Sequence, residues 1–379
     1  MVKPNRATGV QIEMQPKDLR PGESGFGRSC LHVKAGVKRA LGSGVVFLAE
    51  QVPALRKYLK SLGLRISPGS FTDRIVSIWV STNGPFRLTH VDENYLSFQL
   101  FWRGGDYYEP ITRQFLQTLL QPGDTFVDLG AHVGFFSLVV GRHVPGVKVI
   151  AFEPNAKNFR ILLANTAAND LNQIICEPIA ISDTSGTATL YLTESDMSAS
   201  LMKDFQAKDT KQIDSLAVRT TSLDHYLRQH RIQGQLVLKV DIEGHEPAFF
   251  RGATETLSHY KPDIILEVLY DQDPALVGWL KSLGYRFYPI TDEGFMELES
   301  PRLMKRFPFL FLNHLLSVKP KQEIARVFER VNRALGRLNL LETSKHFPQE
   351  QWPLLWQNEP VLDATHEGKA ISNCESQFR

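Results

Sequence analysis

From residue 125 to residue 283, short apolar runs alternate with runs of helical periodicity. The strand-like runs are 125–129, 147–153, 173–181, 235–241 and 262–268. The helix-like runs are 135–143, 156–168, 222–231, 246–259 and 273–283. Strands that alternate with helices predict a parallel sheet with helices on both faces, and a sheet covered in this way needs nearly continuous apolar strands. We therefore predict an α/β, doubly wound fold.

Two more strand-like runs, at 285–290 and 313–318, follow the last of these helices with short links. Parallel strands need long crossover connections, so short links favour antiparallel pairing. We expect an antiparallel pairing at that edge of the sheet.

The residues before 125 are more varied. Residues 1–30 are rich in proline, glycine and charge and predict a loose tail. Apolar spacing predicts a helix within 33–62 and another over 111–121, and three strand-like runs lie between Ile75 and Phe101. We interpret Phe101, Trp102, Tyr107 and Tyr108 as packing residues.

An insertion at 182–221 interrupts the alternation. It contains a strand-like run, "GTATLYLT", and then a polar stretch without clean periodicity. Long polar loops of this kind are often binding loops. We expect residues 193–213, with Met197, Ser198 and Ser200, to cover an acceptor substrate.

The region after residue 320 begins with one basic amphipathic helix over 321–340, followed by an irregular tail. Its apolar stripe comprises Ile324, Val327, Phe328, Val331, Leu335 and Leu338. The helix is interpreted as a solvated basic face packed by this stripe, and the alternative is contact of 321–337 with a membrane surface. We divide the chain into an N-terminal extension (1–85), a central domain (86–320) and a C-terminal extension (321–379).

Composition excludes several classes of protein. The chain has 43 basic and 41 acidic residues, a net charge of +2, so no overall field favours nucleic acid. Its three cysteines are too few and too widely spaced for a disulfide framework. No apolar run resembles a secretory signal or approaches the ~20 residues that span a bilayer. We expect a cytoplasmic protein and make no prediction of its oligomeric state.

A glycine turn follows the first strand of the alternating region, in "DTFVDLGAHVGFFS". Ligands of open parallel sheets bind beyond the carboxyl ends of the strands, where this turn lies. Gly130 permits a tight turn and Gly134 lets the next helix pack closely. Glu153 ends the next strand, where a carboxylate can accept both hydroxyls of a ribose. Asp128 disfavours a pyrophosphate and favours a cationic ligand, so we predict S-adenosyl-L-methionine as the cofactor.

Four stretches extend this interpretation to a family. "DYYEPITRQFLQTLLQPGDTFVDLGAHVGFFS", "AFEPNAKNFRILLANTAAND", "LKVDIEGHEPAFFRGA" and "PDIILEVL" together resemble the FkbM-type methyltransferases. The resemblance covers about residues 86 to 320. It implies a seven-strand Rossmann-like sheet with a reversed last strand. It also implies methyl transfer to a hydroxyl of a sugar, a glycan or glycolipid, or a secondary metabolite.

The resemblance also implies a set of cofactor-binding residues. Beside those of the glycine turn it adds Glu109, His132 and Ala180. His132 departs from the family, which often has Asn at this position, and its side chain is also interpreted as a cap of the turn. The extensions lie outside the resemblance, so the acceptor stays open.

Acidic residues at the ends of the fourth and fifth strands are the catalytic candidates, with a histidine beside them: Asp241, Glu243, His245 and Glu267. In catechol-type O-methyltransferases, acids at such strand ends hold a magnesium ion. Asp241 and Glu267 are therefore candidate ligands of Mg²⁺, with Glu243 nearby. Alternatively, Asp241 assists as a base and His245 takes up the proton. The acids also suit the start of the helix at 246–259, which is a purely structural interpretation.

Three other functions remain open. A methyltransferase for amines or macromolecules usually has an aromatic and amide clamp where this chain has "KVDIEG". A non-catalytic S-adenosylmethionine-binding module is expected to have lost acids that this chain keeps. A dinucleotide oxidoreductase is disfavoured because the turn lacks the middle glycine of G-x-G-x-x-G.

Overall fold

A computed structural model describes residues 75–80, 84–91, 93–193, 199–203, 212–291, 294–302, 304–306 and 309–337. The predicted terminal tails, the predicted helix within 33–62, and Met197 and Ser198 of the predicted loop lie outside these residues. Within them, no helix is long and apolar enough to cross a membrane.

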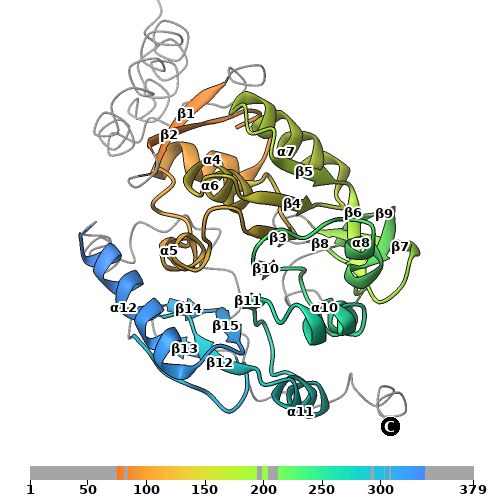
Figure 1. Cartoon of the computed structure of the whole chain (residues 1–379). Helices are drawn as coiled ribbons and strands as arrows, with labels where there is room; N and C mark the ends of the chain where they lie inside the picture. Colours follow the sequence, from red (N-terminus) through yellow and green to blue (C-terminus); the bar gives the residue numbers. More distant parts are fainter. Residues whose placement is uncertain are drawn as a thin grey trace, which may run out of the picture.

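The core of the molecule is a seven-stranded sheet in the order β12-β15-β11-β10-β3-β4-β5 (Figure 1). Neighbouring strands among β11, β10, β3, β4 and β5 pair in parallel, whereas β15 is antiparallel to both β11 and β12. The strands are β3 (Thr125–Leu129), β4 (Lys148–Phe152), β5 (Ile174–Glu177), β10 (Leu236–Val240), β11 (Asp263–Glu267), β12 (Arg286–Pro289) and β15 (Asn313–Ser317). This confirms the doubly wound α/β fold with a reversed last strand. β15 lies one place inside the sheet, and β12 forms the edge.

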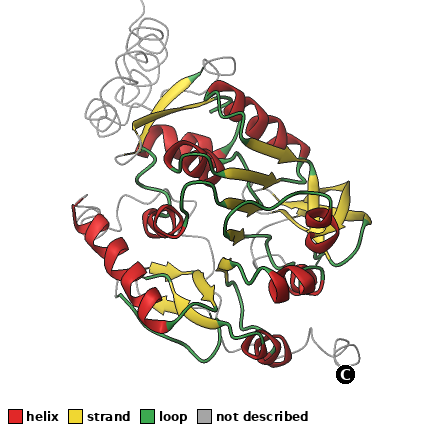
Figure 2. Cartoon of the chain, viewed as in Figure 1, coloured by secondary structure: helices red, strands yellow, loops and turns green. Residues whose placement is uncertain are grey.

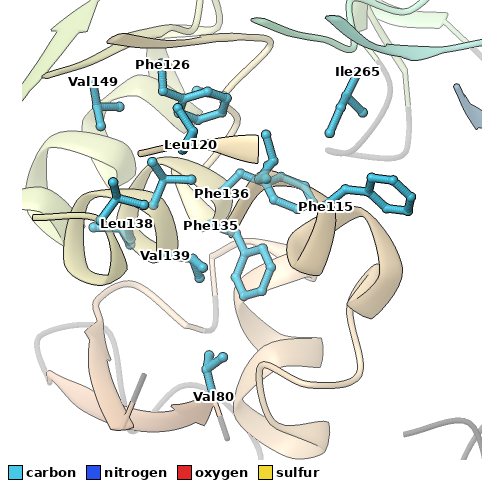
Figure 3. Close-up of a cluster of buried hydrophobic side chains, with 14 of the residues drawn as sticks. Val80, Phe115, Leu120, Phe126, Phe135, Phe136, Leu138, Val139, Val149 and Ile265 are labelled. Carbon is cyan, nitrogen blue, oxygen red and sulfur yellow. The ribbon is translucent and has the colours of Figure 1, made fainter. Parts of the chain in front are cut away.

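Helices lie on both sides of this sheet (Figure 2). They pack on it through two hydrophobic clusters, one on each face. Successive strand residues point to opposite faces, so Phe126 joins the first cluster and Val127 the second. The first contains residues of α5 (Pro110–Leu119), α6 (Phe135–His143), α7 (Ala156–Ala168) and α12 (Lys321–Arg337); Figure 3 shows part of it. The second contains residues of α8 (Leu223–Arg228), α9 (Glu246–Arg251), α10 (Thr254–His259) and α11 (Pro274–Ser282).

The segment around residue 95 corrects the sequence prediction. We predicted a strand there, but α4 (Tyr95–Arg103) is a helix. Its N-cap is Asn94, whose side chain accepts a hydrogen bond from the Ser97 backbone N–H at 3.1 Å. Leu96, Leu100 and Phe101 are buried at helical spacing. The local cap and this face therefore outweigh the strand-like composition, and Phe101 is a packing residue as predicted.

The hairpin of β1 (Val76–Val80) and β2 (Gly84–Leu88) precedes α4. Two asparagines of the chain around α7 hold it: Asn169 Oδ1 accepts from Arg87 N and Asn165 Oδ1 from Thr89 N, both at 2.7 Å. The boundary that we predicted between residues 85 and 86 thus falls inside β2. The domain division remains a prediction.

A second, four-stranded sheet has the order β6-β9-β7-β8. It consists of β6 (Ile179–Ser182), β7 (Gly186–Thr193), β8 (Ala199–Ser200) and β9 (Gln212–Ser222). The strand predicted over 173–181 is therefore two strands in two sheets. Pro178 separates them, and proline lacks the N–H that would continue a ladder. The predicted insertion contains the predicted strand β7 together with β8 and β9, which we did not predict.

The helix predicted over 246–259 is likewise two short helices, α9 and α10. A Cβ atom on Gly252 would lie 2.0 Å from the Ser182 carbonyl oxygen, so glycine is required where the chain passes β6. Asp224 then caps α10, because its carboxylate accepts from the backbone N–H groups of Glu255 at 2.9 Å and Thr256 at 2.8 Å. The predicted helix over 222–231 is shorter too, since α8 ends at Arg228.

The basic helix α12 packs as its periodicity predicts. Ile324, Val327, Phe328, Val331 and Leu335 are all buried. The Phe328 ring meets the Phe115 ring of α5 with centroids 4.7 Å apart. The described residues of the apolar stripe are thus buried against the rest of the molecule. This favours the solvated-face interpretation over insertion into a membrane surface. Two short strands, β13 (Met304–Arg306) and β14 (Phe309–Phe311), pair between β12 and β15 along the chain.

Candidate active site

The glycine turn lies against the end of β10. Gly130 has φ +81°, and a Cβ atom there would lie 1.8 Å from the Asp241 carbonyl oxygen. Gly134 has φ +89°, and its Cβ would lie 2.5 Å from Leu162 Cδ1 of α7. Positive φ and close approach together favour glycine at both positions. As a result, the turn after β3 and the acidic loop after β10 are neighbours at the carboxyl ends of the strands.

Glu153, just after β4, is fastened to this turn. Its Oε2 accepts from the His132 backbone N–H and its Oε1 from the Asn155 backbone N–H, both at 2.8 Å. The residue is buried, and burial raises the pKa of its carboxyl to about 7. Each carboxylate oxygen can accept more than one hydrogen bond. Glu153 thus keeps acceptor capacity toward a ligand above the turn.

His132 links the turn to the hairpin region. It has φ +53°, and its Nε2 lies 3.2 Å from Asn94 Nδ2. Asn94 also caps α4 and donates to Asn158 Oδ1 of α7 at 3.2 Å. These contacts favour the interpretation of His132 as a residue that braces the turn.

Asp128 lies within β3 on the same face as the site. Its Oδ2 accepts from the Ser137 hydroxyl of α6 at 2.7 Å, which fixes the helix to the strand. Its Oδ1 is buried and has no hydrogen-bond partner among the described residues. Burial also raises the pKa of Asp128. An orphaned carboxylate oxygen beside the turn is suited to a cationic ligand group.

Three carboxylates converge where β10 and β11 end. Oxygen atoms of Asp241, Glu243 and Glu267 all lie within 4.8 Å of one another. Glu243 has φ +52°, which turns the loop sharply after β10. The predicted acid cluster thus forms, because the two strands are parallel neighbours and end together.

Lys239 introduces a positive charge that we did not predict. Its Nζ lies 2.6 Å from Asp241 Oδ2, and its side chain is only 2% exposed. Burial alone lowers the pKa of a lysine, but the nearby Asp241, Glu109 and Asp128 more than compensate and raise the pKa of Lys239. The available signal was one lysine inside the otherwise apolar run "LVLKV".

The pKa values of Asp241 and Glu267 are shifted in opposite directions. Burial opposes the charge of Asp241, but the Lys239 ammonium outweighs it and lowers the pKa of Asp241. Glu267 responds in the opposite direction: burial first, and then the negative Asp241 and Glu243, raise its pKa well above the ordinary range. The two carboxyl groups of the Asp241–Glu267 pair are thus shifted in opposite directions, Asp241 toward the ionised form and Glu267 toward the protonated form.

The segment before α5 lies near the same acids. Glu109 adopts φ +39° at the N-cap of α5, and its Oε2 accepts from Asn313 Nδ2 of β15 at 2.8 Å. Tyr108 packs edge-on against the Phe135 ring, with centroids 5.4 Å apart. Burial and the charges of Glu109, Asp241 and Glu267 raise the pKa of the Tyr108 phenol. Tyr108 thus packs against the core, as predicted from the sequence, and also lies near the acids of the candidate site.

Two residues that we predicted for the site, His245 and Ala180, contact residues outside the acid cluster. His245 Nε2 is 2.9 Å from the Ser182 hydroxyl. Burial lowers the pKa of His245, and its charged neighbours are Asp183 and Arg251. Ala180 lies in a small apolar cluster of the second sheet with Leu190 and Val218. Neither contact connects these residues to the carboxylates around Asp241.

One residue of the insertion contacts the backbone of the loop that carries Glu243. The Ser200 hydroxyl in β8 donates to the Glu243 carbonyl oxygen at 2.6 Å and accepts from Met202 N at 3.0 Å. The second sheet therefore touches the loop that carries Glu243. This contact is consistent with the predicted position of the insertion beside the acceptor, and its role stays a prediction.

Comparison with known proteins identifies the domain. Residues 128–287 match the model of the methyltransferase FkbM domain. A methyltransferase of Sordaria araneosa, sdnD, is 38% identical over 71 residues, which cover 18% of this chain and 27% of that protein. The chain therefore carries an FkbM methyltransferase domain, which extends from Asp128 in the glycine-turn strand past Glu267.

Solved structures with a related arrangement are distant. The methyltransferase FkbM of Methylobacillus flagellatus is 16% identical, with a TM-score of 0.35 over 59% of this chain and 52% of that chain. The O-methyltransferase of Bacillus cereus, solved with SAH, is 15% identical, with a TM-score of 0.33 over 56% of this chain and 82% of that chain. The first of these matches spans about half of the solved chain.

Proposed function

We propose that this protein is an S-adenosyl-L-methionine-dependent O-methyltransferase. Its acceptor is a hydroxyl group of a sugar, a glycan or glycolipid, or a secondary metabolite. One observation carries the proposal: the 128–287 match to the methyltransferase FkbM domain contains the glycine turn, Glu153 and the acid cluster together. The contact of the turn with the β10 loop and the convergence of the acids support one shared site at the carboxyl ends of the strands.

The residues around the turn suit the proposed cofactor. Glu153 has acceptor capacity for ribose hydroxyls beside the turn. The orphaned Asp128 Oδ1 and the net negative charge of the acids favour a ligand with a cationic amine and a sulfonium. When bound, this cofactor supplies an electrophilic methyl group. At Gly130 the absence of a side chain lets the turn lie directly against the Asp241 carbonyl oxygen, which brings the turn and the acid cluster together beside the proposed ligand.

Asp241 is the group that we assign to the acceptor hydroxyl. Its Oδ2 is held by Lys239 at 2.6 Å, and in this proposal its carboxylate accepts the hydroxyl proton as the oxygen gains the methyl group. Its lowered pKa keeps it ionised, so it is ready to accept a hydrogen bond near neutral pH. General bases of this kind contribute about 10²–10⁴-fold. Orientation of the two reactants contributes the rest.

The neighbours of Asp241 position its carboxylate in this proposal. Glu267 lies against Asp241 and helps to hold its carboxylate in place, and Tyr108 lies near the same acids from the segment before α5. We assign no proton transfer to His245, because its ring nitrogen is already hydrogen-bonded to Ser182.

The decisive test uses methyl-labelled S-adenosylmethionine with a panel of acceptors. Sugar nucleotides, glycolipids and polyketides are compared with amines and peptides, and Asp241→Asn serves as the control. We expect label in a hydroxyl-bearing acceptor with wild type and much less with the variant. Label confined to amines would contradict O-methylation. Cofactor binding without transfer to any acceptor would favour a non-catalytic binding module.

A further inference from the structure

The acid cluster does not fit the magnesium ion that strand-end acids suggest. Mg²⁺ requires near-ideal octahedral geometry with oxygen ligands at about 2.0–2.1 Å. Here Asp241 Oδ2 already holds an ammonium at 2.6 Å. A divalent ion on this carboxylate would sit beside a fixed positive charge.

Lys239 cannot easily leave this position. It is paired within β10 to Asp128 of β3 on one side and Ile265 of β11 on the other, so its backbone lies in the centre of the sheet. Its Nζ also lies over the Phe136 ring, 4.8 Å from the centroid. A side chain that is 2% exposed has no path to solvent without repacking.

We propose that Lys239 is the built-in cation of the acid cluster: its ammonium takes the place of a divalent metal and positions Asp241, so that the site works without magnesium. The positive charge lies against Asp241, a member of the acid cluster, and close to Glu109 and Asp128, so it offsets negative charge that a metal would otherwise neutralise. Lys239 acts through Asp241 and is buried away from substrate, so it is a positioning residue. The catalytic part of this inference rests on the proposed function, whereas the metal-binding part does not.

Calorimetry with Mg²⁺ tests the inference directly. Wild type is titrated to about 10 mM, tenfold above the Kd of about 10⁻³ M of weak protein sites for divalent cations. We expect no binding. Lys239→Met keeps the length of the side chain but removes the charge, and we expect it to bind Mg²⁺ at least tenfold more tightly than wild type. A second change, Asp241→Asn, should abolish the gained site.

Lys319→Met is the matched control. Lys319 is also paired to a buried carboxylate, since its Nζ lies 2.8 Å from Asp263 Oδ2, but it lies at the other end of the strands. Its loss should create no magnesium site. Binding of Mg²⁺ by wild type that is lost in Asp241→Asn would overturn the inference. So would a folded Lys239→Met protein that binds none.

A second measurement keeps the test independent of how well Lys239→Met folds. Wild-type methyl transfer is followed with EDTA and then with added Mg²⁺. We expect a rate unchanged within about twofold, whereas loss with EDTA and recovery with Mg²⁺ would contradict the inference. For folded Lys239→Met, we expect near-normal cofactor affinity, a lower kcat and partial rescue by Mg²⁺. If no acceptor is methylated at all, the proposed function fails, and the calorimetry still decides the role of Lys239.

Discussion

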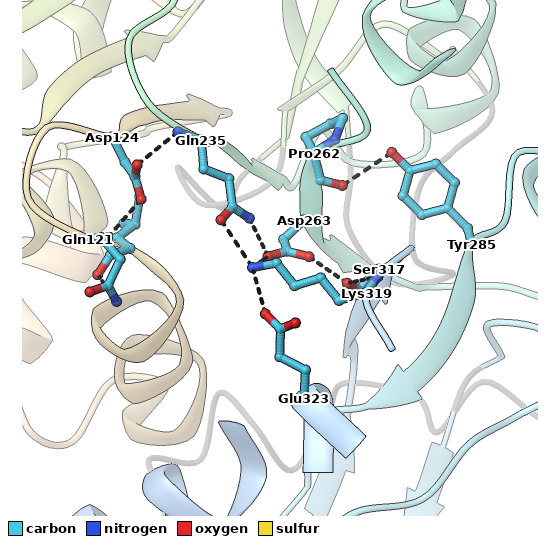
Figure 4. Close-up of polar contacts among 10 residues, drawn as sticks. Gln121, Asp124, Gln235, Pro262, Asp263, Tyr285, Ser317, Lys319 and Glu323 are labelled. Atoms are coloured by element: carbon cyan, nitrogen blue, oxygen red, sulfur yellow. Dashed lines mark hydrogen bonds and ion pairs between the residues drawn. The ribbon is translucent and has the colours of Figure 1, made fainter. Parts of the chain in front are cut away.

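Carboxylates are buried at both ends of the central strands, but their hydrogen-bond partners differ between the two ends. At the amino ends, every carboxylate oxygen of Asp124 and Asp263 has a partner (Figure 4). Asp124 accepts from the backbone N–H groups of Gln121 and Gln235, both at 2.8 Å. Asp263 accepts from the Ser317 hydroxyl at 2.6 Å and pairs with Lys319 at 2.8 Å.

At the carboxyl ends, acids outnumber their partners. Asp128 Oδ1 and Glu267 Oε2 are buried with no hydrogen-bond partner among the described residues. Burial raises the pKa of Glu109, Asp128, Glu153 and Glu267, and one lysine lies among them. Fully satisfied polar networks stabilise a fold, whereas clustered perturbed acids mark functional sites. The same sheet thus has a structural end and a candidate chemical end.

The largest expected effect is on the chemical end. Asp241→Asn should lower kcat by about 10²–10⁴-fold, the range of a general base, because the amide cannot take the hydroxyl proton. Cofactor affinity should stay near normal. Steady-state kinetics and calorimetry measure the two quantities. A variant that turns over at the wild-type rate would show that the loop after β10 is only a helix start.

The next effect is on the structural end. Asp263→Ala removes the partner of Lys319, Ser317 and Gln235 together. Removing one member of a buried charge pair costs about 3–5 kcal/mol, and we expect the lower part of this range because Lys319 is 23% exposed. Denaturant unfolding measures the loss. The folded fraction should keep the wild-type kcat, and a large fall in kcat would erase the distinction between the ends.

Glu153 is expected to make the stability of the folded protein depend on pH. Its folded pKa is about 7, above its ordinary value of 4.5. The folded protein therefore holds this proton more tightly than the unfolded chain. The resulting stability is fully present below pH 4.5 and is lost as pH rises through 7. From 1.36 kcal/mol per pKa unit, the loss is about 3 kcal/mol.

Glu153→Gln, which cannot titrate, isolates this contribution. Denaturant unfolding of the variant and wild type at several pH values between 4.5 and 8 measures the difference. The variant should gain stability relative to wild type as pH rises. A difference that is constant with pH would contradict the raised pKa.

The smallest expected effect compares two glycines that flank β3. Gly123 and Gly130 have similar positive φ values of +87° and +81°, but only Gly130 faces an obstacle, the Asp241 carbonyl oxygen. Both alanine variants incur left-handed strain of roughly 1–2 kcal/mol. Gly130→Ala should lose roughly 1–3 kcal/mol more from overpacking. Equal melting temperatures would mean that the turn and the β10 loop do not touch.

Apolar patterning predicted most of the fold. The strands β3, β4, β10 and β11 were predictable because burial on both faces demands continuous apolar residues. α4 was not, because "YLSFQLFW" has strand-like residues and its helix depends on the Asn94 cap. The break between α9 and α10 was also missed, since it depends on Asp224, far away in sequence.

Some residues of the candidate site were likewise predictable from the sequence, and others were not. Asp128, Glu153, Asp241 and Glu267 stand at strand ends and could be recognised from their positions. Lys239 was missed because a lysine in a buried strand has meaning only once Asp241 and Glu109 are known to surround it. The packing of Tyr108 was predicted, but its nearness to the acids was not, because an aromatic residue outside the alternating region gives no sign of them.

Calorimetry with S-adenosylmethionine tests the central claim, that the carboxyl ends of the strands form the cofactor site, most directly. Wild type, Glu153→Ala and Asp263→Ala are titrated as folded protein. We predict one equivalent bound by wild type and unchanged affinity in Asp263→Ala. Glu153→Ala should bind roughly 10- to 150-fold more weakly, as expected for a lost hydrogen bond to a charged acceptor of about 1.5–3 kcal/mol. No binding by wild type, or equal affinity in all three proteins, would contradict the account.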